Sequence, residues 1–213
     1  MTAIAIAMTR SEIIIGADSR VTWPGQKRVE TVCKVICVDR TAFLFAGYGG
    51  NTNSGLDIRQ KGIESITAGG TLAQIADRFS EMIWEPLKND LADSFIADPI
   101  GYEHRFEREP ELEVAFAAFE QGSARLVYVD YMLKIEMDYF LETTRREYQP
   151  ENKAEVVLLG YKAKAMDPSK SNLIDTVERA IELAVDECPL VGRPISILRI
   201  TKDSSEWIKP GRC

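Results

Sequence analysis

Small and large apolar residues alternate in the N-terminal part of the chain with the period of a β-strand. Residues 2–9 alternate alanine with isoleucine or methionine, and residues 12–18 contain three consecutive isoleucines. Alternation is typical of a strand whose two faces differ, whereas an unbroken apolar run indicates a strand that is covered on both faces. We therefore expect these two segments to form a first hairpin at the centre of a sheet.

A second hairpin and two helices are predicted next. Residues 31–38 and 41–46 are apolar runs separated by a short polar turn, and the glycine-rich stretch GYGGNTNSG follows them. One helix is expected directly after this stretch. Thr71 and Gln74 form a capping-box signature at the start of a second helix, which Pro86 should kink or end.

The remaining chain predicts four strands, one helix and two closing strands, after a polar loop at about 98–110. The helix is expected around residues 172–187, where apolar residues recur at helical spacing. The six strands are expected over residues 111–120, 124–131, 133–142, 154–161, 192–200 and 204–208.

This order of elements predicts an α+β fold. Two sheets packed on each other, with helices on their outer faces, would bury both the doubly apolar strands and the apolar stripes of the helices. We therefore expect a four-layer α-β-β-α sandwich. No stretch rich in proline, glycine and serine interrupts the chain, so a single domain spanning residues 1–213 is expected.

The net charge and the hydropathy of the chain argue against several classes of binding partner. The net charge of -7, with no basic block longer than a pair, argues against nucleic acid and against anionic membranes as partners. No apolar run approaches the roughly 20 residues that span a bilayer, and no secretory signal is visible. A cytoplasmic location is therefore expected.

The cysteines do not form a pattern that indicates a metal site. Cys33 and Cys37 lack a second pair of ligands for zinc, and Cys188 and Cys213 are isolated. We expect reduced, buried thiols, no bound metal and no cofactor.

Three polar residues interrupt otherwise apolar strands. Thr2 begins the first strand, Asp18 ends the second, and Lys34 lies within the third, at equal intervals of 16 residues. A buried ammonium group needs a partner of opposite charge, and Asp18 is the candidate. Antiparallel passes of this length would bring a hydroxyl, a carboxylate and an amine to one end of the sheet.

These residues resemble those of a known family. Thr2, the segment G-A-D-S-R at 16–20, Lys34 and the segment A-G-Y-G-G at 46–50 resemble the proteasome β-type subunits and their bacterial ring-forming relatives. These proteins belong to the N-terminal nucleophile (Ntn) hydrolases. The resemblance covers most of the chain in the order of elements, and its motifs lie mainly in residues 2–50.

The resemblance implies a mechanism. Removal of Met1 would expose Thr2, whose free α-amine acts as general base for its own hydroxyl. Lys34, held ionised by Asp18, would stabilise the developing alkoxide. The backbone N–H of Gly47 would stabilise the tetrahedral oxyanion.

The resemblance also implies partners and a substrate pocket. The substrate would be a peptide or an unfolded protein, and the chain would assemble into a homo-oligomeric ring or a larger assembly that encloses the site. The positions that match the family's apolar pocket are Val21, Val32, Ile36 and Phe45.

The chain departs from the family pattern at two places that support the terminal amine. Active members have a serine after the glycines of the strand near 154–161, and an aspartate and a serine before the glycine that follows the last long helix. Here these regions read LLGYKAKAMD and DECPLVGRP, with Asp186 and Glu187 as candidate substitutes. Three functions therefore stay open: a threonine peptidase, a hydrolase of small amides, and a catalytically inactive ring or scaffold subunit.

Overall fold

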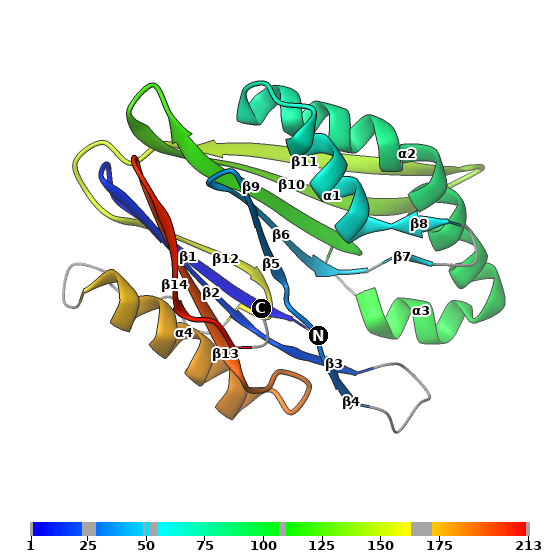
Figure 1. Cartoon of the computed structure of the whole chain (residues 1–213). Helices are drawn as coiled ribbons and strands as arrows, with labels where there is room; N and C mark the ends of the chain where they lie inside the picture. Colours follow the sequence, from blue (N-terminus) through cyan, green and yellow to red (C-terminus); the bar gives the residue numbers. More distant parts are fainter. Residues whose placement is uncertain are drawn as a thin grey trace.

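Two five-stranded antiparallel sheets form the centre of the molecule, as the computed structural model in Figure 1 shows. The structure describes residues 2–22, 29–48, 50–51, 55–106, 110–162 and 172–211. The mixed fold with antiparallel strands that the sequence predicts is confirmed.

The first sheet has the N-terminal hairpin in its interior. Its strand order is β12-β1-β2-β13-β14. The bounds are Ala3–Met8 for β1, Glu12–Asp18 for β2, Glu155–Gly160 for β12, Ile195–Thr201 for β13 and Ser205–Lys209 for β14. All of β1 is buried, as is β2 from Ile13 to Asp18, which is why apolar residues occupy both faces of these strands.

The second sheet has the order β11-β10-β9-β6-β5. The bounds are Val35–Val38 for β5, Thr41–Gly47 for β6, Leu112–Glu120 for β9, Ser123–Ile135 for β10 and Tyr139–Tyr148 for β11. Two short ribbons complete the described strands: β3 (Arg20–Thr22) pairs with β4 (Val29–Thr31), and β7 (Gly50–Asn51) pairs with β8 (Leu56–Asp57).

Helices cover the outer faces of both sheets (Figure 1). The bounds are Ile58–Thr67 for α1, Leu72–Ala97 for α2, Pro99–Phe106 for α3 and Leu173–Glu187 for α4. α1 and α2 pack on the second sheet, and α4 packs on β1 and β2 of the first. α2 and α4 thereby bury the apolar stripes that the sequence shows, and α3 packs against α2.

The two sheets pack face to face through an apolar layer of their own. The first sheet contributes side chains such as Ile4, Ile6 and Ile15, and the second contributes Leu44 and small residues of β9. Any side chain that points from the end of a strand into this layer therefore lies between the sheets. Asp18, Lys34 and Gly47 all lie near such ends.

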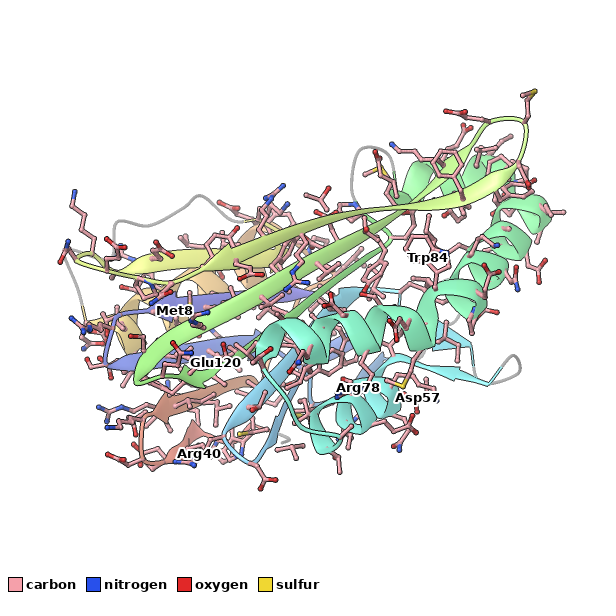
Figure 2. All side chains as sticks on the ribbon, turned by 90° about the horizontal axis from the view of Figure 1, so that it is seen from above. Met8, Arg40, Asp57, Arg78, Trp84 and Glu120 are labelled. Atoms are coloured by element: carbon pink, nitrogen blue, oxygen red, sulfur yellow. The ribbon has the colours of Figure 1, made fainter. Side chains whose placement is uncertain are left out.

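Local hydrogen bonds explain where the helices begin. Asp57 accepts a hydrogen bond from the Gln60 N–H at 3.0 Å and caps α1 (Figure 2). Thr71 begins α2 with the capping box that the sequence predicts. Glu120, at the end of β9, accepts a bond from the Leu72 N–H at 2.6 Å and so ties α2 to the second sheet.

One prediction for the helical region is wrong and another is wrong in part. Pro86 does not end α2, which continues to Ala97 but changes direction along its length (Figures 1 and 2). The fully buried side chains of Phe79, Ile83 and Leu87 hold the helix on the sheet on both sides of the proline, and this packing outweighs a defect of about 3 kcal/mol. The expected polar loop at 98–110 contains α3. Asp98, the residue before this helix, accepts a bond from the Gly101 N–H at 3.0 Å.

The turn between β10 and β11 also lies later than expected. The sequence predicts strands over 124–131 and 133–142, whereas the structure continues β10 to Ile135 and begins β11 at Tyr139. Tyr131 and Leu133 are both buried and pair with β11, so the ladder passes through residue 132 without interruption.

Candidate active site

Asp18 lies at the end of β2, with no exposed surface, and its carboxylate accepts four hydrogen bonds. One oxygen accepts the Ala3 N–H at 2.9 Å and the Lys34 ammonium at 2.7 Å. The other accepts the N–H groups of Arg20 and Gly192, each at 3.2 Å. A carboxylate with both oxygens satisfied in this way is fixed in position and suited to carry a negative charge.

Lys34 is 4% exposed and forms a buried ion pair with Asp18. Its ammonium also donates to the Arg20 carbonyl at 2.7 Å. Burial lowers the pKa of Lys34, and the adjacent Asp18 carboxylate opposes that shift by favouring the charged amine. The pair that the sequence predicts is therefore brought together.

Lys34 does not lie within a strand, in contrast to the expectation of a strand over 31–38. Residues 32–34 are irregular, and β5 begins only at Val35. The Val32 N–H donates to the Ser19 carbonyl at 2.8 Å. This segment therefore pairs with the backbone beside Asp18 instead of extending the second sheet, which places Lys34 over the carboxylate.

Thr2 is partly buried and immediately precedes the residue whose N–H binds Asp18. Its carbonyl accepts the Tyr161 N–H at 2.7 Å, which continues the β1–β12 ladder by one residue. In β1, Ile4 faces the layer between the sheets, and alternation places the Thr2 side chain on that same face. Met1 lies outside the described residues.

Gly47 ends β6 in a conformation that glycine adopts readily, with φ of 96°. A Cβ at this position would overlap the Glu111 carbonyl oxygen. Tyr48, the next residue, donates its N–H to that carbonyl at 2.7 Å. Because bonded and non-bonded pairs alternate along an antiparallel ladder, Gly47 turns its own N–H away from β9.

Gly160 connects this strand end to Thr2. A Cβ on Gly160 would overlap the Thr2 carbonyl oxygen and lie 3.2 Å from the Cβ of Ala46, the neighbour of Gly47. Thr2, Asp18, Lys34 and Gly47 therefore gather at one end of the two sheets. Their catalytic roles remain predictions.

The residues that the sequence predicts to line a substrate pocket lie in different parts of the structure. Ile36 is 8% exposed and, with Phe45, packs in the core under α1 and α2. Val32 is partly buried in the irregular segment before Lys34. The Val21 backbone belongs to β3, but its side chain lies outside what the structure describes. Their role in substrate binding stays a prediction.

Of the two candidate substitutes for the amine-supporting residues, Glu187 reaches β12. Its carboxylate accepts the Tyr161 hydroxyl at 3.2 Å, and the Tyr161 N–H in turn holds the Thr2 carbonyl. Asp186 is exposed. Residues 163–171, where the family pattern continues, lie outside the described part of the chain.

The sequence interpretation did not include one buried carboxylate near Thr2. Glu113 on β9 is 4% exposed and lies opposite Ala46 in the ladder with β6. It accepts hydrogen bonds from the Tyr128 hydroxyl at 2.6 Å and from the Gly160 N–H, and Lys162 lies 3.6 Å away. Its signal was a single charge within the apolar run LEVAFAAF, which is the kind of signal that identified Lys34.

The cysteine expectation is partly wrong. Cys37 and Cys188 are free thiols, but Cys33 is disulfide-bonded, and Cys213 lies outside the described residues. Cysteine spacing along the chain does not show which thiols the fold brings close. Within the described ranges, no group of three or more His, Cys, Asp or Glu residues is arranged to hold a metal ion.

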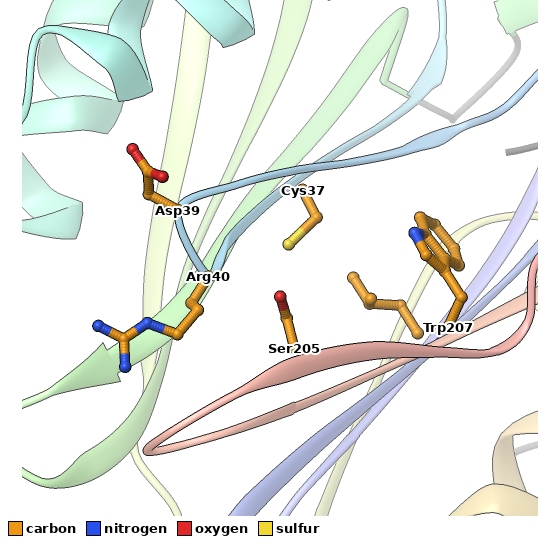
Figure 3. Close-up of a pocket in the computed structure, with 6 residues that line it drawn as sticks. Cys37, Asp39, Arg40, Ser205 and Trp207 are labelled. Carbon is orange, nitrogen blue, oxygen red and sulfur yellow. The ribbon is translucent and has the colours of Figure 1, made fainter.

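A cavity of about 580 Å³ opens at the opposite end of the sheets (Figure 3). Cys37, Arg40 and Trp207 are among its lining residues, between the β5–β6 turn and β14. Lys34 and Gly47 lie at the other ends of β5 and β6. This cavity is therefore separate from the site around Thr2.

Comparison with known proteins supports the fold. No protein-family model and no curated protein matches the sequence. Among solved structures, a (Gly-1) mutant of Anbu from Hyphomicrobium sp. strain MC1 matches with a TM-score of 0.58 and 13% identity, over 98% of this chain and 87% of that chain. Anbu is proteasome-like, so the chain has a proteasome-like fold, and at this identity the likeness extends to the fold alone. Among the described helices, none is both long and apolar enough to cross a membrane.

Proposed function

We propose that this protein is an N-terminal threonine hydrolase that cleaves amide bonds, with Thr2 as the nucleophile after removal of Met1. The observation that carries the proposal is the buried Asp18–Lys34 pair, which is bonded to the backbone of the residue after Thr2. Burial of an ion pair is costly unless its geometry is good. A pair of this kind beside a threonine supports a catalytic use.

In the proposed reaction, the neutral α-amine of Thr2 takes the proton from the Thr2 hydroxyl as the oxygen attacks the amide carbonyl. The Lys34 ammonium favours the developing alkoxide and disfavours a second positive charge on the amine. The tetrahedral oxyanion accepts the Gly47 N–H, a contribution on the order of 3 kcal/mol in other oxyanion holes. The leaving amine then takes the proton, and water hydrolyses the ester that remains.

The proposal includes an architecture and an assembly. The order helix, sheet, sheet, helix supports a four-layer α-β-β-α sandwich that forms one domain over residues 1–213. The proteasome-like fold supports a homo-oligomer, a ring or a larger assembly, that encloses the sites and admits peptides or unfolded proteins in the cytoplasm. Sedimentation analysis of the untagged protein tests the assembly.

A second candidate is a catalytically inactive ring or scaffold subunit. The observation in its favour is the departure around the terminal amine, where Tyr161 follows Gly160 and Val191 precedes Gly192. In this case the Asp18–Lys34 pair would serve only to fix the end of β2. A third candidate keeps the nucleophile but acts on small amides, because fold and nucleophile are shared across substrate classes.

Intact mass of the untagged protein, before and after treatment with a peptide epoxyketone, separates these candidates. The proposal expects a mass without Met1 and a single adduct that maps to Thr2. Thr2→Ala should form no adduct, whereas Thr67→Ala, which changes an exposed threonine at the end of α1, should react like the wild type. Retained Met1 with no adduct would indicate the scaffold, and an adduct without peptide cleavage would indicate a small-amide substrate.

A further inference from the structure

Glu113 is a buried carboxylate at the Thr2 end of the sheets that the mechanism above does not use. It lies on β9, and its contacts are with residues of β10 and β12 or just beyond. Both of its oxygens accept hydrogen bonds, one from the Tyr128 hydroxyl and the other from the Gly160 N–H. The Lys162 ammonium lies 3.6 Å from one of these oxygens, so the side chain also has a partner of opposite charge.

We propose that Glu113 is a positioning residue for Thr2, which fixes the backbone of the nucleophile and sets the pH at which its α-amine becomes an effective base. This inference rests on the proposed function. It adds a carboxylate that the family motifs in residues 2–50 do not contain.

The positioning acts through the end of β12. Glu113 holds the Gly160 N–H, and the N–H of the following residue, Tyr161, holds the Thr2 carbonyl at 2.7 Å. Gly160 has φ of 71° and approaches the Thr2 carbonyl too closely to carry a Cβ. The Glu113 carboxylate therefore fixes the end of β12, and the next residue is hydrogen-bonded to the Thr2 backbone.

Tyr128, on the neighbouring strand β10 of the same sheet, fixes the position of the Glu113 carboxyl group. Its hydroxyl donates to Glu113 at 2.6 Å, and its ring is buried between the sheets with Arg146 5.7 Å from the ring centre. Burial and the bond to Glu113 both raise the pKa of Tyr128, so the hydroxyl keeps its proton and remains a donor. Glu113 is thereby held between β10 and β12.

The charge of Glu113 opposes that of Lys34 at the Thr2 amine. A nearby negative charge favours the ammonium form and raises the pKa of the amine, whereas Lys34 lowers it. Removal of the Glu113 charge should therefore let the amine lose its proton at a lower pH. Among the described residues, charged or titratable groups from several elements lie around this region: Asp18, Arg20, Lys34, Tyr128, Asp130, Arg146, Lys162 and Glu187.

The test is the rate at which a peptide epoxyketone labels Thr2, followed by intact mass from pH 5.5 to 9.5. Glu113→Gln removes the charge and keeps the size of the side chain. We expect its maximal labelling rate to fall about ten-fold, as for other groups that orient reactive residues. We also expect the acid limb of its pH profile to move to lower pH by roughly 0.5–1 unit.

Two tyrosines of β10 provide matched variants. Tyr128→Phe removes a donor to Glu113 but keeps the charge, so its labelling rate should fall about three-fold with the acid limb unchanged. Tyr131→Phe removes a buried hydroxyl that binds Ser80 on the helix side of the same strand, and it should label like the wild type.

A wild-type rate and profile in Glu113→Gln would overturn the inference and leave the proposed function intact. Equal losses in Tyr128→Phe and Tyr131→Phe would also overturn it, because they would reflect general destabilisation, and this comparison decides the question if Glu113→Gln does not fold. If the wild type forms no adduct at any pH, the proposed function itself fails and the inference fails with it.

Discussion

At the scale of single residues, Asp18 is the most constrained group of the site. It joins three separate parts of the chain, because its partners are the backbone of Ala3, the side chain of Lys34 and the backbone N–H of Gly192. A side chain with so many donors around it tolerates no change in charge. The contribution of Asp18 to the free energy of unfolding can therefore be measured independently of any activity.

Asp18→Asn should destabilise the protein by about 3–5 kcal/mol, because it leaves the Lys34 ammonium buried without its counter-charge and turns an amide N–H₂ toward other donors. The free energy of unfolding in urea measures the change. Lys34→Met is the matched variant, and the double variant should lose less than the sum of the two single losses. Strictly additive losses would show that the pair does not interact energetically.

The residues of the site differ in how far sequence reveals them. Asp18 and Lys34 are polar interruptions of apolar runs in the sequence at regular spacing, and Gly47 belongs to a glycine motif, so their patterns are local. Glu113 also interrupts an apolar strand, but its meaning arises from the bond to Gly160, which is 47 positions away in the sequence. Contacts between sheets leave no periodic signal in one sequence.

At the scale of elements, strand periodicity gives the core strands correctly, and tertiary packing explains the errors. α2 passes through Pro86 because its buried face continues on both sides. The segment after it forms α3, which begins with Asp98 as the capping residue and Pro99 as the first helical residue, a pattern typical of a helix start. The sequence alone does not predict segments whose secondary structure depends on packing against another helix or strand.

The contact between β2 and α4 rests on the absence of a side chain at Gly16. A Cβ there would overlap Cγ1 of Val177, so Gly16→Ala should push α4 away and destabilise the protein by about 1–3 kcal/mol. Thermal unfolding measures the loss. Val177→Ala in the same chain should recover part of it, because the removed methyl groups make room for the new one.

The same displacement should reach the site, since the residues after α4 supply the Gly192 N–H to Asp18. We therefore expect Gly16→Ala to slow labelling of Thr2 and the added Val177→Ala to restore it in parallel with stability. Labelling that stays at the wild-type rate while the melting temperature falls would show that α4 supports the fold but not the site.

At the scale of the whole molecule, the layered packing places polar tyrosines in both apolar layers of the second sheet. Tyr128 faces the layer between the sheets and Tyr131 faces the helices. Burial is the main cause that raises the pKa of each phenol, so the folded protein keeps both neutral. An unfolded tyrosine loses its proton at about pH 10.

Stability should therefore fall as pH rises above about 10, because the unfolded state releases protons that the folded state retains. Burial and the bond to Asp90 raise the pKa of Tyr48 in the same direction. The three phenols together give a slope of up to about 4 kcal/mol per pH unit, and Tyr131→Phe should remove about a third of it. Lys34 contributes in the opposite direction. Because its pKa is lower in the folded protein than in the unfolded chain, its contribution to stability rises with pH, but only below the unfolded lysine pKa of about 10.4. Urea unfolding between pH 9 and 11.5 measures the slope, and an equal slope in Tyr131→Phe would show that the buried phenol does not control alkaline unfolding.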